Sequence, residues 1–210
     1  MIQQDKHTTE HAILEALELP ECAVCALNQR AVEGWVDSLL RDGVTNIRSR
    51  LRFREAGGLC ADHSRLLDER GNPLGVAILM HDLFTEASPA QVGKRAAVRC
   101  EACNFLRETE ARYVDALAGA LVWPETRKAF EASRGLCVPH MRRLLRRARR
   151  PVETAVRMAC AAHLEPLTAE LAEIIRKNDY RFRHEEWGPE ADAWKRALER
   201  WSGTCVAPEG

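Results

Sequence analysis

Apolar positions recur along much of this 210-residue chain in steps of three and four, which is the period of a helix packed on one side. The clearest stretch begins at Val152 and continues through Val156, Ala159, His163, Leu167, Leu171 and Ile174. No segment shows the alternation or the β-branched enrichment that strands need. The pattern predicts an all-α protein, with one long helix from Val152 and another helix near the C-terminus.

Five prolines mark places where helices are expected to begin. A first helical turn tolerates proline, whereas a helix interior does not. The five prolines follow Asn72, Ser88, Trp123, Arg150 and Gly188. Long helical patterns lie between these marks, which supports the all-α prediction.

Two parts of the chain align with each other. Cys22-Ala-Val-Cys25 aligns with Cys100-Glu-Ala-Cys103 at an offset of 78 residues. Further on, GGLCADH, which ends at His63, aligns with RGLCVPH, which ends at His140, at an offset of 77. Each repeat therefore reads as a CxxC pair, a long helix, a second helix, and a GLCxxH segment that opens a third helix.

These repeats suggest how the chain is organised. We expect one compact domain built from four consecutive parts. They are an N-terminal segment over 1–19, a first helical repeat over 20–98, a second over 99–150, and the long helix, C-terminal helix and tail over 151–210.

Each repeat supplies three cysteines and one histidine, the ligand mix of a closed structural zinc site. A helix that begins at GLCxxH places residues i and i+3 on one face of its first turn. One such motif alone is often a set of buried core residues, but two complete copies in the same order favour two zinc ions. Pairing across the repeats stays open beside pairing within each repeat. The predicted ligands are Cys22, Cys25, Cys60, His63, Cys100, Cys103, Cys137 and His140.

Other cysteine chemistries fit less well. Covalent haem attachment needs a histidine directly after CxxC, but Ala26 and Asn104 stand there. A thioredoxin-type site needs a βαβ context, and catalytic zinc needs an open position. An iron–sulfur cluster remains the alternative, because three cysteines and a histidine can also hold one.

The other cysteines are predicted to play no part in metal binding. Cys160 and His163 form a CxxH without a partner CxxC, and they lie on the apolar stripe of the long helix, so we interpret them as core residues. A hydrolase with Cys160 as nucleophile and His163 as base ranks below the metal hypotheses. Cys205, in the tail, is interpreted as a free thiol.

Composition limits the choice of partner and compartment. The 31 basic residues balance 31 acidic ones, and 26 of the basic residues are arginine. The run from Arg142 to Arg150 is therefore interpreted first as a solvated helix face; nucleic acid is a less favoured partner than a protein. No apolar run approaches the roughly 20 residues of a membrane span, and Met1 begins a polar stretch. We expect a cytoplasmic protein with no membrane partner, whose cysteines stay reduced.

With the repeats and the ending NDYRFRHEEWGPEADAWKRAL in view, the chain resembles an uncharacterised bacterial domain-of-unknown-function family. Its members share CxxC followed by GxCxxH, twice, then a long helix and a DYRFR…WGxE…W close. The resemblance covers roughly residues 20–202 and implies a small helical metal-binding protein without an established activity. Cys160 is not part of the family pattern.

The sequence thus favours a non-enzymatic interaction or regulatory module held together by two structural zinc sites. The alternative is an iron–sulfur or thiol redox protein, acting as an electron carrier or a sensor.

Overall fold

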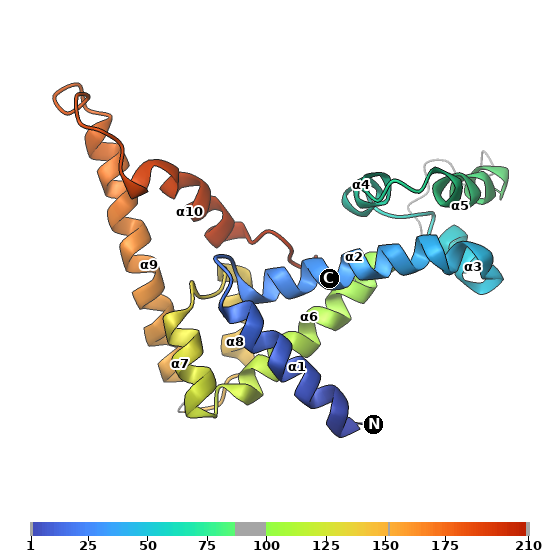
Figure 1. The fold of residues 1–210 in the computed structure, drawn as a ribbon, viewed down its shortest axis with the longest axis horizontal. Helices are drawn as coiled ribbons and strands as arrows, with labels where there is room; N and C mark the ends of the chain where they lie inside the picture. Colours follow the sequence, from blue (N-terminus) through green and yellow to red (C-terminus); the bar gives the residue numbers. More distant parts are fainter. Residues whose placement is uncertain (1, 87–99, 151, 209–210) are drawn as a thin grey trace. The chain divides into compact units, whose positions relative to one another are not determined.

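A computed structural model describes residues 2–86, 100–150 and 152–208 (Figure 1). These residues form ten α-helices and two short 3-10 helices, and they contain no strand, which confirms the all-α prediction. The elements are α1 (Ile2–Leu17), α2 (Ala23–Arg41), η1 (Gly43–Thr45), α3 (Ile47–Glu55), α4 (Ala61–Glu69), α5 (Pro73–Glu86), α6 (Glu101–Ala120), α7 (Pro124–Ala132), α8 (Val138–Arg147), α9 (Val152–Lys177), η2 (Pro189–Asp192) and α10 (Ala193–Ser202).

Proline marks several of the observed helix starts. Pro73 begins α5, Pro124 begins α7, and Pro189 begins η2. The long helix predicted from Val152 is α9, which runs for 26 residues. The start expected at Ser88-Pro89 lies outside the described residues, as does the predicted repeat boundary at residue 98.

The chain divides into two compact units. The first consists of residues 1–27 and 110–206, and the second of residues 28–109 and 207–210. The bounds of these units differ from those of the two predicted repeats. Helices α2 and α6 each contribute residues to both units.

The core of the first unit is formed by α1, α2 and α6–α9. Leu144 of α8, Phe130 of α7 and Leu117 of α6 are at most 1% exposed and belong to one hydrophobic cluster. Ile13 and Leu17 of α1 join this cluster, so the segment before the first CxxC is part of the core. Helix α10 contacts α9 and α8, and it begins beside α9 (Figure 1).

The core of the second unit is smaller. Val36, Leu39 and Phe53 are buried there together with Leu67 and Leu79. Phe53 and Phe130 occupy aligned positions of the two repeats, and each is at most 2% exposed in its own unit. Equivalent positions of the repeats therefore fill two separate cores.

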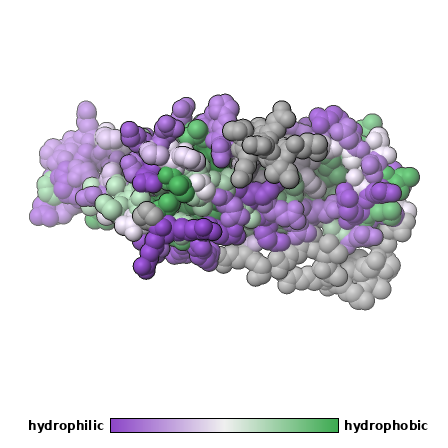
Figure 2. Space-filling model, turned by 90° about the horizontal axis from the view of Figure 1, so that it is seen from below, coloured by the Kyte–Doolittle hydropathy of each residue, from purple (hydrophilic) through white to green (hydrophobic). Residues whose placement is uncertain are grey.

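The face of the molecule seen in Figure 2 is mostly polar. On the face shown in Figure 2, hydrophilic residues cover most of the described part, and hydrophobic residues appear in smaller groups between them. Among the described helices, none is both long enough and apolar enough to span a bilayer.

Replacing Leu144 with alanine should destabilise the first unit strongly. The side chain is fully buried, so its loss removes apolar contacts and leaves a cavity, which costs about 2–5 kcal/mol of unfolding free energy. Ile175→Ala, at a residue that is 75% exposed in α9, is the matched control and should change stability by about 0.5 kcal/mol or less. Urea unfolding monitored by circular dichroism measures both changes, and equal effects would contradict the core assignment.

Candidate metal centres

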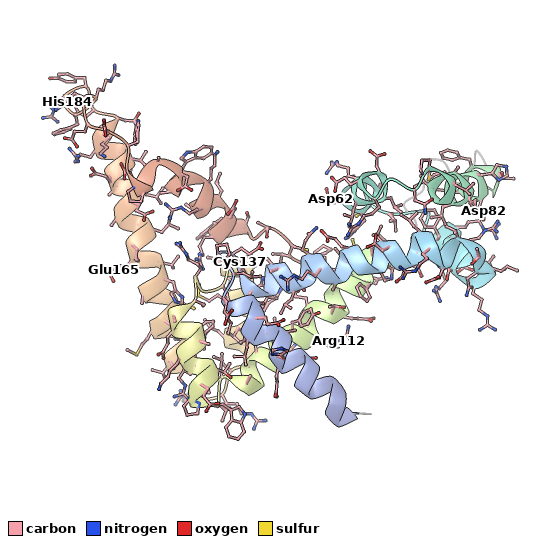
Figure 3. The ribbon with its side chains drawn as sticks, viewed as in Figure 1. Asp62, Asp82, Arg112, Cys137, Glu165 and His184 are labelled. Carbon is pink, nitrogen blue, oxygen red and sulfur yellow. The ribbon has the colours of Figure 1, made fainter. Side chains whose placement is uncertain are left out.

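The first cluster lies at the start of two helices of the first unit. Cys22 directly precedes α2 and Cys25 lies in its first turn. Cys137 directly precedes α8, and His140 lies in its first turn. Figure 3 labels Cys137 in the connection between α7 and α8. The four donor atoms all lie within 4.8 Å of one another.

Individual distances in the first cluster match the edges of a tetrahedron around one ion. The Sγ atoms of Cys22, Cys25 and Cys137 lie 3.4, 3.5 and 3.1 Å from Nδ1 of His140. Sγ of Cys25 lies 3.8 Å from Sγ of Cys137. Sulfurs bound to one zinc ion at about 2.3 Å are separated by about 3.8 Å in a regular tetrahedron.

The second cluster has the same plan in the second unit. Cys60 directly precedes α4 and His63 lies in its first turn, while Cys100 and Cys103 hold the equivalent positions of α6. The Sγ atoms of Cys60, Cys103 and Cys100 lie 3.1, 3.4 and 3.6 Å from Nδ1 of His63. These four donor atoms also lie within 4.8 Å of one another.

The ligands pair across the repeats. CxxC of the first repeat meets CxxH of the second at the first cluster, and CxxC of the second repeat meets CxxH of the first at the second cluster. Of the two pairings that the sequence left open, the structure thus has the one that crosses the repeats. Grouping within each repeat would join ligands that the structure places in different compact units.

All four ligand pairs use the same local geometry. In each motif the first residue stands just before a helix, and its carbonyl accepts a hydrogen bond from the backbone N–H four positions on. The second ligand is then the third residue of that helix, on the same side. Cys60 and Cys137 make no capping hydrogen bond with their side chains, so both sulfurs point at the cluster and not at the helix end.

Two helix N-termini therefore face each cluster. The positive end of a helix dipole stabilises nearby negative charge and favours thiolate over thiol. In α8, Pro139 occupies the first turn, where it needs no hydrogen-bond acceptor. The helix starts thus contribute to the electrostatics of the clusters as well as to their geometry.

A buried carboxylate orients the histidine of the first cluster. Nε2 of His140 donates to Oε1 of Glu110 at 2.6 Å, and the guanidinium of Arg143 pairs with the same carboxylate. His140 is 0% exposed and Glu110 is 3% exposed. Such a contact fixes the ring so that Nδ1 faces the sulfurs, and it raises the basicity of a histidine ligand.

The second cluster lacks this support. At the repeat offset of 78 residues, Glu110 aligns with Val32, which is buried and cannot accept a hydrogen bond. Among the residues that the structure describes, none accepts a hydrogen bond from Nε2 of His63. The cysteines of the second cluster are all half-buried, whereas Cys25 and Cys137 of the first are buried. The first cluster is therefore the better shielded of the two.

The C-terminal helix closes one side of the first cluster. Gly203 ends α10 with φ of +76°, and a Cβ atom at this position would lie 3.0 Å from Sγ of Cys137. Arg200 donates through Nη1 to the carbonyl of Leu136 at 2.9 Å and through Nη2 to the carbonyl of Arg134, so it fixes the loop before Cys137. Sequence reasoning missed these residues because nothing local marks them.

The side chains of the first cluster shift one another's pKa values. The pKa of Cys25 lies far below its usual range because its sulfur accepts hydrogen bonds from Cys137 and Cys22. Burial disfavours the protonated ring of His140, but its contacts with the sulfurs of Cys22 and Cys25 raise its pKa to about 9. The lowered pKa favours thiolate at Cys25, and thiolate is the form that binds metal.

The remaining sequence candidates are not members of either cluster. Cys160 is buried in the first core, and burial raises the pKa of its thiol to about 11. Nε2 of His163 hydrogen-bonds the carbonyl of Glu131, and within the described part of the chain no hydrogen bond joins His163 to Cys160. Neither Cys160 nor Cys205 belongs to a ligand group found among the described residues.

Sequence comparisons place the chain among proteins without an assigned activity. A family of unknown function (DUF6062) matches residues 88–208, so the chain belongs to that family. The chain is also similar to an uncharacterised 23.9 kDa protein encoded in the xynA 3′ region of Caldicellulosiruptor sp. (strain Rt8B.4). The two are 27% identical over 203 residues, which cover 91% of this chain and 100% of that protein. No solved structure matches the chain.

Replacing Glu110 with glutamine should weaken metal binding at the first cluster only. The ring of His140 would lose the charged acceptor that orients it, and loss of such a partner typically lowers metal affinity 10–100-fold. Titration with Co²⁺, read from its visible absorption with a chelator as competitor, measures the affinities of both clusters.

Glu108→Gln is the matched control, because Glu108 is exposed on the same helix. Thermal unfolding of the metal-loaded proteins checks that the substitution has not disrupted the fold. Unchanged affinity in Glu110→Gln, or an equal loss at both clusters, would refute the role of Glu110.

Proposed function

We propose that this protein is a non-enzymatic interaction or regulatory module whose two compact units are each held together by one structural zinc ion. The observation that supports this most strongly is the grouping of eight predicted ligands into two Cys₃His sets, each within 4.8 Å. Every set joins residues that are distant in sequence, such as Cys25 and Cys137, which are 112 positions apart. A shared metal ion explains why these side chains lie close together.

Zinc suits the composition and the spacing of the ligands. Three thiolates and one imidazole form a closed tetrahedral set, which leaves no position for a reacting water molecule. The contacts of 3.1–3.8 Å correspond to donors around a single ion. An iron–sulfur cluster contains several iron atoms and would hold its ligands further apart. The spacing therefore favours one ion at each site over a cluster.

The charge at each site can be balanced by its surroundings. Three thiolates and Zn²⁺ give −3 + 2 = −1. At the first site, burial lowers the pKa of Arg200, whereas the sulfurs of Cys22 and Cys137 raise it, so this guanidinium lies where it can offset that charge. The positive ends of the two helices that begin at each site also offset its negative charge.

Zinc binding would supply a large share of the stability of each unit. Structural zinc contributes about 10–16 kcal/mol to the folding of small zinc domains. The net stability of a whole domain is about 5–15 kcal/mol. The second unit has the smaller hydrophobic cluster, so we propose that it depends more strongly on its metal.

The geometry gives little support to a hydrolase. The Cys160 thiol has a raised pKa and no hydrogen bond to His163 within the described residues, so the nucleophile and base of that hypothesis are not assembled. The proposed compartment is the cytoplasm, where thiolate ligands stay reduced.

Protein purified without oxygen should contain two zinc ions per chain and be colourless. Zn²⁺ has a filled d shell and absorbs no visible light, whereas iron–sulfur clusters absorb broadly near about 400 nm. Elemental analysis together with a visible spectrum distinguishes the two. Iron at stoichiometric levels would support the redox alternative and contradict the zinc proposal.

Cys60→Ala should remove one metal equivalent and loosen the second unit. Without its fourth ligand the site loses most of its binding free energy, and local opening should become frequent. Hydrogen exchange with mass spectrometry should show faster exchange within residues 28–109 and little change within 110–206. Cys205→Ala is the control and should retain two zinc ions. Unchanged metal content in Cys60→Ala would exclude Cys60 as a ligand.

A further inference from the structure

Helix α10 carries an exposed apolar stripe. Trp194, Leu198 and Trp201 are 51, 61 and 68% exposed, and they follow the i, i+4, i+7 spacing of one helix face. The other side of the helix is anchored, because Arg196 bonds Glu170 and Arg200 bonds the loop before α8. The stripe is thus presented on a fixed helix. Grouped large apolar side chains at a surface typically mark an interaction site.

An arginine of α8 borders this stripe. The guanidinium of Arg142 lies 5.9 Å from the centre of the Trp201 ring, and Arg146 follows one turn later on α8. Arg143 and Arg147 instead pair with carboxylates of α6. The basic run that we first interpreted as a solvated face therefore has two sides. One side is neutralised by α6, while Arg142 and Arg146 are exposed and form no ion pair among the described residues.

We propose that this face binds an acidic amphipathic α-helix of a partner protein. This inference rests on the interaction role proposed above and adds to it the surface and the partner class. The spacing of the stripe matches the anchors by which one helix docks on another, and the unpaired guanidinium groups favour carboxylates beside those anchors. We call this face the α10 surface; it consists of Trp194, Leu198, Trp201, Arg142 and Arg146.

A second copy of the chain is a poorer occupant. A symmetric dimer through this face would bring the same patch of both copies together. Arg142 and Arg146 of one copy would then approach the same residues of the other, and like charges at an interface oppose association. Complementarity of charge requires a partner that is acidic where this surface is basic.

Nucleic acid and lipid fit less well than an acidic helix. Single-stranded nucleic acid uses successive aromatic rings as stacking platforms, but Leu198 separates Trp194 from Trp201. Glu199 is exposed next to Leu198 and would repel a continuous layer of phosphates. A peptide helix can place a neutral or basic residue opposite Glu199 and carboxylates opposite the arginines.

The probe for the test is a fluorescein-labelled designed peptide of roughly 20 residues, long enough to form a helix on binding. It carries leucines at i, i+4 and i+7 with glutamates beside them; a second peptide carries lysine in place of every glutamate. Fluorescence anisotropy with the full zinc-loaded chain measures both affinities. We expect saturable binding of the acidic peptide that weakens with salt, and at least tenfold weaker binding of the basic one.

Variants assign the binding to the α10 surface. Trp201→Ala should weaken acidic-peptide binding at least about tenfold, because buried tryptophans dominate interface energetics. Trp123→Ala is the matched control, since Trp123 is 64% exposed at the start of α7, and it should change affinity less than twofold. Arg146→Glu should weaken binding and reduce its salt dependence, whereas Arg48→Glu on α3 should leave both unchanged.

Several results would overturn the proposal. The first is equal binding of the two peptides, or no binding of either. The second is an equal loss of affinity in Trp201→Ala and Trp123→Ala. The third is stronger binding to a deoxythymidine oligomer or to phosphatidylserine vesicles than to the acidic peptide, and the fourth is a dimer that Trp201→Ala dissociates. Metal analysis of the same samples separates the two proposals. If chains that contain two zinc ions fail to bind the acidic peptide, only the proposed α10 surface is refuted. If chains without zinc bind the peptide, only the proposed structural zinc sites are refuted.

Discussion

The meeting of helix N-termini in pairs is the constraint on which this fold depends. Each of the four ligand motifs places one donor just before a helix and the next at its third residue. One helix start can therefore offer only two donors to an ion, and a tetrahedral site requires two helix starts. Helix α2 must meet α8, and α4 must meet α6, before either site is complete. The positive ends of these helices also stabilise the thiolates that gather there.

The two sites share a plan but differ in their surroundings. The first has Glu110 behind His140, Arg200 on the loop before Cys137, and the backbone of Gly203 against the sulfur of Cys137. The second has a valine at the position aligned with Glu110 and three half-buried cysteines. Burial from solvent and hydrogen bonds from neighbouring residues to the metal ligands slow the loss of the metal and the oxidation of the thiolates. We therefore propose that the second site exchanges its metal more readily.

The features that depend on local sequence patterns, such as helix starts and the ligand motifs, could be predicted from the sequence. The helix beginning directly after Cys137 followed from Pro139 and the GLCxxH spacing, and the long helix from Val152 followed from its apolar period. The pairing of the motifs could not be predicted, because spacing within a motif fixes two ligands and says nothing about the other two. The alignment of the repeats does distinguish Glu110, because it pairs this charged residue with the apolar Val32. The exposure of Trp194 and Trp201 depends on tertiary packing, so only the structure reveals it.

Metal counting by native mass spectrometry on two double variants tests the central claim most directly. If the ligands pair across the repeats, Cys22→Ala combined with Cys137→Ala damages one site twice and the chain keeps one zinc ion. Cys22→Ala combined with Cys60→Ala then damages both sites and the chain keeps none. Pairing within the repeats predicts the reverse, with no zinc in the first double variant and one in the second, and that result would contradict the account.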